Sequence, residues 1–137
     1  MNRLISIKAS AIAAFALLMM APVTFADDHW SDDWKIVVDG KADSGGSISF
    51  KVTFEPNEDG STRAAAEISA LVAEGTSEND TADLIGNAFR AVLGEDDFKI
   101  DVSWGENVKI DSKRKTPDFL LELTGNSVQG VSIDIED

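Results

Sequence analysis

Apolar and polar side chains alternate with a period of two along most of this chain, but one central segment follows a helical period instead. Ser77 can cap the first turn of that helix, and Gly94 can end the last one. Its apolar positions fall on one stripe, formed by Ile85, Ala88, Phe89 and Val92 and widened by Leu84, Ala91 and Leu93. We therefore predict one amphipathic helix from Ser77 to Leu93 with this stripe buried.

Two segments before the helix alternate as strands that each have a buried and an exposed face. Their inward positions are Trp34, Ile36 and Val38 in the first segment and Ile48, Phe50, Val52 and Phe54 in the second. A turn over residues 56–60 follows. Residues 62–74 are ambiguous, because their run of alanines favours a helix whereas Ile68, Ala70 and Val72 alternate. The tight turn before them suits a hairpin, so we predict a strand.

The period of two returns after Gly94. The inward positions are Phe98, Ile100, Val102 and Trp104, then Val108 and Ile110 across a turn, then Phe119, Leu121 and Leu123, and finally Val131, Ile133 and Ile135. Val128 is out of phase with the last set, which indicates a bulge at Gly130. We predict an α+β fold in which about seven strands form a mainly antiparallel sheet, with the one helix packed on one face.

The first 26 residues have the pattern of a signal peptide. Arg3 and Lys8 precede an apolar run over residues 11–21, and small residues lie at Thr24 and Ala26. Cleavage after Ala26 would leave 111 residues, a natural length for one domain. We expect residues 27–33 to form a flexible acidic leader, residues 34–137 to form the domain, and the protein to be periplasmic or secreted.

The charge of the chain narrows the choice of partners. There are 25 acidic and 12 basic side chains, and removal of residues 1–26 would leave ten basic ones and a formal net charge of −15. Such a protein repels phosphate backbones and anionic lipids, so we expect no nucleic-acid partner and no adsorption to an anionic membrane. The apolar run at 11–21 is too short for a comfortable membrane span and there is no second run, so we expect no membrane span. Cationic ligands, metal ions and basic proteins would be attracted.

Few residues could carry out catalysis. The chain has no cysteine, no tyrosine and a single histidine, His29, which lies in the expected leader, where nothing holds it beside a nucleophile. The acidic turns at 57–61 and 95–97 lack the alternating spacing of a calcium-binding loop. We therefore expect a protein that is not an enzyme.

The expected mature terminus offers one metal site. After cleavage the chain would begin Asp27, Asp28, His29, which places an α-amine, two backbone amide nitrogens and an imidazole in one short segment. Four nitrogens in a plane suit Cu(II) and Ni(II). The segment resembles the amino-terminal copper and nickel motif of several extracellular proteins, and this resemblance implies a metal site at Asp27, Asp28 and His29.

Basic residues are concentrated in one segment, KIDSKRK at 109–115. Lys113, Arg114 and Lys115 fall on a loop between predicted strands, where they can bind a partner or only balance local charge. We expect an exported binding module that associates with a protein, an envelope polymer or copies of itself. The alternatives are a copper- or nickel-binding protein that uses its mature terminus and a secreted enzyme inhibitor that inserts an acidic turn.

Overall fold

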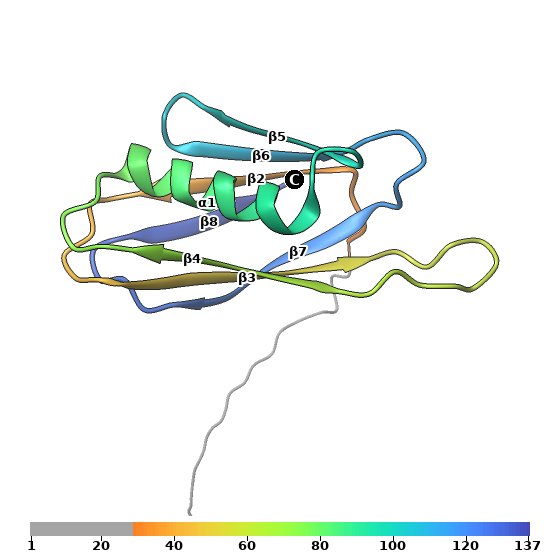
Figure 1. Cartoon of the computed structure of the whole chain (residues 1–137), viewed down its shortest axis with the longest axis horizontal. Helices are drawn as coiled ribbons and strands as arrows, with labels where there is room; N and C mark the ends of the chain where they lie inside the picture. The colour runs from red at the N-terminus through yellow and green to blue at the C-terminus, as the bar shows by residue number, and fades with distance from the viewer. Residues whose placement is uncertain (1–28) are drawn as a thin grey trace, which may run out of the picture.

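The structure, a computed structural model, describes residues 29–137 and contains seven strands and one helix (Figure 1). In chain order these are β2 (Asp33–Asp39), β3 (Gly46–Phe54), β4 (Ala66–Val72), α1 (Glu78–Leu93), β5 (Phe98–Ser103), β6 (Asn107–Ser112), β7 (Phe119–Asn126) and β8 (Ser132–Glu136). The predicted α+β class is confirmed, and the ambiguous segment at 62–74 contains strand β4. The expected signal peptide, Asp27 and Asp28 lie outside the described residues.

The seven strands divide between two antiparallel sheets. One sheet has the order β5-β6-β2-β8, and the other has the order β4-β3-β7. The two sheets meet where the chain enters β2, because Ser31 and Phe119 exchange backbone N–H to O=C hydrogen bonds of 3.1 and 2.9 Å. The backbone carbonyl of Asp32 also accepts a bond from the N–H of Ser112. Part of the segment expected to be a flexible leader is thus bonded to the body of the domain.

Helix α1 begins and ends as the sequence predicts. The Ser77 side chain accepts a hydrogen bond from the backbone N–H of Asp80, and the N–H of Gly94 bonds to the carbonyl of Arg90. The helix contacts β4 of one sheet and β5, β6 and β2 of the other. Phe50 of β3 meets Phe89 of the helix at a ring-centroid distance of 5.3 Å. The two sheets therefore share one core, which the helix helps to enclose.

The buried stripe of α1 differs from the predicted stripe. The buried residues are Thr81, Ala82, Ile85, Gly86 and Phe89. Leu84 is 38% exposed and Val92 is 50% exposed, although both were expected to be buried. Gly86 explains the shift, since a Cβ atom there would lie 2.7 Å from Cγ2 of Val102. The helix turns this glycine toward β5, and the opposite flank of the apolar stripe is left open.

The prediction that Trp104 points into the core is wrong. Strand β5 ends at Ser103, and Trp104 lies in the turn to β6 with a side chain that is 88% exposed. The turn gives positive φ to two successive residues, 54° at Trp104 and 75° at Gly105. Turns of this kind favour Asn or Gly at the first position. A tryptophan whose backbone adopts this left-handed conformation costs roughly 1–2 kcal/mol of conformational energy, so its position here needs an explanation.

The irregularity near the end of the chain also differs from the prediction. The bulge lies in β7 and not at Gly130. Ser49 of β3 pairs with Gly125 but Phe50 pairs with Leu123, so β7 has one extra residue at this point. Leu123 is 39% exposed rather than buried. Gly130 instead lies in the turn before β8 with a φ of 88°. Val128, which was out of phase with the strand pattern, is buried in that same connection.

Candidate functional site

The predicted basic loop lies between β6 and β7, with Lys113, Arg114 and Lys115 all exposed. Its backbone is ordered by the N–H of Lys113, which bonds to the carbonyl of Asp97 at 2.8 Å, and by the N–H of Thr116, which bonds to the carbonyl of Lys113 at 3.0 Å. Lys115 has a φ of 75°. The structure thus brings the three predicted cations together on one fixed loop.

The three cations of this loop have no carboxylate partner within 4.0 Å in the part of the chain that the structure describes. The ammonium of Lys113 bonds to the backbone carbonyl of Glu95 instead. Among the described residues, Lys41, Lys51 and Arg90 likewise have no carboxylate within 4.0 Å, but they lie apart from one another, whereas the loop holds three such cations in succession. The loop therefore keeps its charge available to an outside partner.

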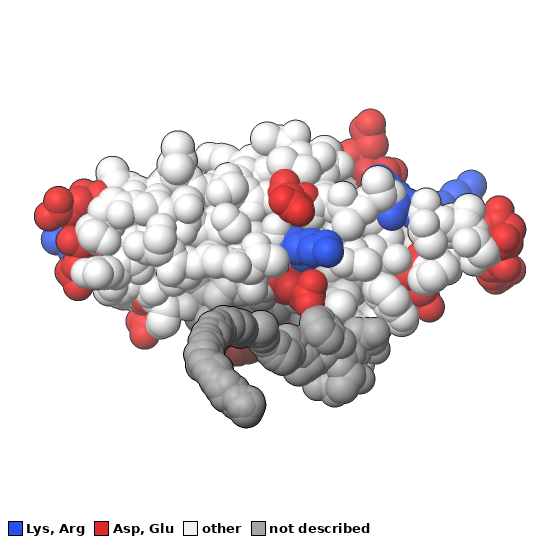
Figure 2. Space-filling view, turned by 90° about the horizontal axis from the view of Figure 1, so that it is seen from below, with Lys and Arg blue, Asp and Glu red and all other residues white. Residues whose placement is uncertain are grey.

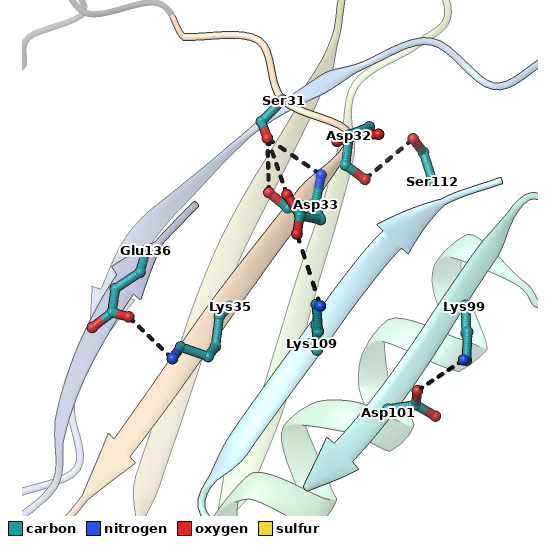
Figure 3. Close-up of polar contacts among 9 residues, drawn as sticks. All are labelled: Ser31, Asp32, Asp33, Lys35, Lys99, Asp101, Lys109, Ser112 and Glu136. Carbon is teal, nitrogen blue, oxygen red and sulfur yellow. Dashed lines mark hydrogen bonds and ion pairs between the residues drawn. The ribbon is translucent and has the colours of Figure 1, made fainter. Parts of the chain in front are cut away.

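Lysines on the four-stranded sheet are arranged differently (Figure 3). Lys35 pairs with Glu136 at 3.2 Å, Lys99 with Asp101 at 3.5 Å, and Lys109 with Asp33 at 3.9 Å. Burial raises the pKa of Asp111 on the same face, and the neighbouring Lys109 works against that rise. The cations of this face are compensated within the fold, which makes the face a weaker candidate for binding than the loop.

The outer face of the three-stranded sheet carries few charges. Figure 2 shows a largely uncharged surface with a basic group between acidic groups, and the strand register likewise places Lys51 opposite Glu67 and Glu122. Leu71 is 81% exposed beside a shallow depression lined mainly by glycine, serine and small apolar residues. No charged side chain lines this depression, so nothing indicates which ligand it would take.

Acidic residues gather around the β5–β6 turn, at the far end of β6 from the basic loop. Glu78 accepts a hydrogen bond of 3.0 Å from the backbone N–H of Gly40, and this bond holds the pKa of Glu78 below its usual value. A hydrogen bond with Glu78, together with the negative charges of Glu78 and Asp39, raises the pKa of Glu106. The exposed ring of Trp104 projects from the same turn.

Sequence reasoning missed this end of the molecule, because the alternation in β5 continues formally through Trp104. The Trp104-Gly105 pair was the available signal, since glycine marks the turn and a residue beside it leaves the strand. The start of helix α1 lies against a hairpin that is distant in the sequence, since a Cβ atom on Gly105 would be 2.6 Å from Oδ1 of Asn79. Only the tertiary structure shows that contact.

His29 lies on the surface near the beginning of the described chain. Its Nε2 atom contacts the carboxylate of Asp137, and its ring meets Trp34 edge-on at a centroid distance of 6.3 Å. The Nδ1 atom takes no part in the contact with Asp137. Asp27 and Asp28, the other residues of the predicted metal site, fall outside the described residues. Within residues 29–137 there is no cluster of three or more His, Cys, Asp or Glu suited to a metal ion.

The acidic turn at 57–61 forms the tip of the β3–β4 connection, which extends beyond the body of the domain (Figure 1). The carboxylate of Asp59 accepts bonds from the N–H and Oγ of Ser61 at 2.8 and 2.6 Å, and these bonds lower the pKa of Asp59. At the base of the connection, Arg63 pairs with Asp97 at 2.7 Å. The inhibitor alternative would use this ordered tip.

Comparisons with protein-family models, with curated protein sequences and with solved structures each find no match to this chain. Among the helices of residues 29–137, none is long and apolar enough to cross a bilayer.

Proposed function

We propose that this protein is an exported, non-enzymatic binding module that associates with a carboxylate-bearing partner through Lys113, Arg114 and Lys115. The observation that supports the proposal is that this loop presents three consecutive exposed cations without a carboxylate partner in the described structure. The bonds that fix the loop backbone reduce the ordering cost of binding.

The charge distribution of the protein directs an acidic partner toward this loop. The net charge of the protein repels an acidic partner from most approaches, whereas a local group of exposed cations attracts it to one place. A guanidinium can also bind a carboxylate in a bidentate manner, which an ammonium cannot. Arg114 would therefore contribute more to affinity than either lysine.

Zero-length carbodiimide cross-linking tests the proposal, because it couples an amine only to a carboxylate in direct contact. The protein would be cross-linked in the envelope of the cells that produce it, and the products mapped by mass spectrometry. We expect intermolecular cross-links at Lys113 or Lys115. Lys35, Lys99 and Lys109 serve as internal controls, since each already lies beside an acidic residue of its own chain.

Arg114→Ala provides the matched variant, because it keeps both reactive lysines of the loop. It should lower the yield of intermolecular cross-links severalfold, whereas Lys51→Ala, on the outer face of the three-stranded sheet, should leave the yield unchanged. Intermolecular cross-links that are equally frequent at the control lysines would contradict the proposal.

Copper binding at the mature terminus is a second candidate function, supported by the contact between His29 and Asp137. A chelate that continues from the backbone amides closes its ring through Nδ1, and the Asp137 contact involves Nε2. A carboxylate on the second imidazole nitrogen is a common way to orient a metal-binding histidine. The structure thus leaves the required nitrogen free of that contact.

The copper candidate is tested on protein processed by the cells that produce it. Intact mass should give Asp27 as the first residue, and one equivalent of Cu(II) should produce the visible band of square-planar nitrogen ligation. His29→Ala should abolish the band, while Asp137→Ala should retain it. A different first residue, or an unchanged band in His29→Ala, would exclude this site.

A further inference from the structure

The end of the molecule opposite the basic loop carries an exposed aromatic ring, one exposed acid and two half-buried acids. Trp104 is 88% exposed in a backbone conformation that favours Asn or Gly, so the fold holds a large apolar ring in solvent on a strained turn. Isolated strain of this kind often marks a functional position. The ring is therefore a candidate anchor for a partner.

The acids around Trp104 determine which kind of partner fits. Two backbone bonds bring these acids together: the N–H of Val38 bonds to the carbonyl of Glu106 at 2.9 Å, and the N–H of Gly40 bonds to the carboxylate of Glu78 at 3.0 Å. Asp39 lies between Val38 and Gly40 in the chain. A hydrogen bond with Glu78 and the charges of Glu78 and Asp39 accordingly raise the pKa of Glu106. Lys41, in the adjoining β2–β3 connection, is the nearest basic residue along the chain, so the acids outnumber it. A cation would relieve the repulsion between these carboxylates and could stack on the indole ring. The partner should thus present Lys and Arg side chains.

This chain itself presents such a group on the loop that contains Lys113, Arg114 and Lys115. According to the proposed function, that loop binds carboxylates, and the Trp104 end presents carboxylates together with an aromatic face. The two surfaces lie at opposite ends of β6 (Figure 1). This strand has six residues and therefore separates them by about 20 Å. A single molecule cannot join its own two ends.

We infer that the Trp104 end of one copy, with Asp39, Glu78 and Glu106, receives the Lys113-Arg114-Lys115 loop of a second copy. This inference rests on the proposed function and names its partner. The contact is heterologous, since two different surfaces meet, so each added copy leaves one surface of each kind free. The copies join head to tail into rings or open filaments. Arg114 stacks on Trp104, and the lysines face the carboxylates.

Two variants, each with one of the two surfaces blocked, test the inference. Trp104→Asn removes the ring, and Asn suits the positive φ of the turn, so the fold is retained. Reversal of Lys113, Arg114 and Lys115 to Glu blocks the other surface. Circular dichroism should be unchanged in both variants. In sedimentation velocity at about 0.1 M salt, the wild type should form oligomers that grow with concentration, and each variant alone should stay monomeric.

An equimolar mixture of the two variants provides the decisive measurement. Trp104→Asn keeps a working loop, and the loop variant keeps a working Trp104 end, so one productive contact remains between them. The mixture should form a heterodimer and no larger species. Raising the salt to about 1 M, where the Debye length falls to about 3 Å, should dissociate it. A mixture that stays monomeric, or a Trp104→Asn variant that still assembles alone, would overturn the inference.

The outcome also separates this inference from the proposed function. A monomeric wild type whose Lys113 or Lys115 becomes cross-linked to another protein or to an envelope polymer would overturn self-association and leave the binding module intact. A monomeric wild type without such cross-links would overturn both.

Discussion

Arg90 donates a hydrogen bond from Nη2 to the backbone carbonyl oxygen of Ile100, 2.9 Å away, and thereby connects the last turns of α1 to β5. The Nη1 atom of the same guanidinium donates to Oδ1 of Asn87 at 2.9 Å. Because β5 is an edge strand, its outer backbone groups could otherwise pair with another chain. The helix thus both encloses the core and protects one edge of the sheet.

Arg90→Ala should lower the free energy of unfolding by about 1.5–3 kcal/mol, the range for a hydrogen bond to a charged group. It should also increase aggregation on partial denaturation, since the β5 edge becomes open. Urea unfolding and light scattering measure the two effects. Asn87→Ala is the control, because it removes only the group that orients the guanidinium and should cost less. Equal losses in the two variants would argue against a role for the Ile100 contact.

Phe50→Ala and Phe89→Ala should each lower the free energy of unfolding by about 3–5 kcal/mol, because both rings are fully buried and in contact. A domain of this size has a total stability of about 5–15 kcal/mol, so either variant would be severely weakened. Val92→Ala removes a half-exposed side chain of the same helix and should cost under about 1 kcal/mol. A comparable loss at Val92 would show that the helix stripe is buried as the sequence predicts.

The sequence predicts elements well where a single period decides them. Strand β3 and helix α1 follow from local patterns, and the structure confirms both. Local patterns could not predict how the strands divide between two sheets, because Ser31 and Phe119, which connect the sheets, are far apart in the chain. Nor could they predict the rotation of α1, which depends on the fit between Gly86 and Val102.

Thr81→Val should raise the free energy of unfolding by about 1 kcal/mol. The Thr81 side chain is fully buried, and its Oγ1 atom has no hydrogen-bond partner among the described residues. A buried hydroxyl without a partner carries a desolvation cost, which an apolar side chain of the same shape avoids. Thr81→Ser is the control, since it keeps the hydroxyl and adds a small cavity, and it should be destabilising. A destabilised valine variant would indicate that the hydroxyl has a partner in solution.

The candidate site could be predicted in part. The basic loop follows from the concentration of basic residues at 109–115 between two predicted strands, and the structure places all three cations on one exposed loop. Their lack of carboxylate partners could not be foreseen, because it depends on where the folded chain places its acids. The Trp104 end was missed for a related reason, since the strand pattern continues into a turn that only the backbone conformation reveals.

Glu78 and Glu106 should give pH dependences of opposite sign when each is changed to Gln. The fold raises the pKa of Glu106, so its favourable contribution is present when it is protonated and is lost as the pH rises through that pKa. The fold lowers the pKa of Glu78, so its contribution is present above the ordinary pKa of glutamate and is lost as the pH falls through the folded value.

At about pH 7, Glu106→Gln should therefore raise the melting temperature, because it removes a repelled charge and keeps a donor for Glu78. Glu78→Gln should lower it, because the Gly40 N–H loses a charged acceptor and the first turn of α1 loses a negative charge. Both differences should shrink toward about pH 3, where the wild-type carboxyls bind protons. Calorimetry over this range measures the two curves. Parallel curves for the two variants would mean that Glu78 and Glu106 titrate independently, and the repulsion that a docked cation would relieve would then be absent.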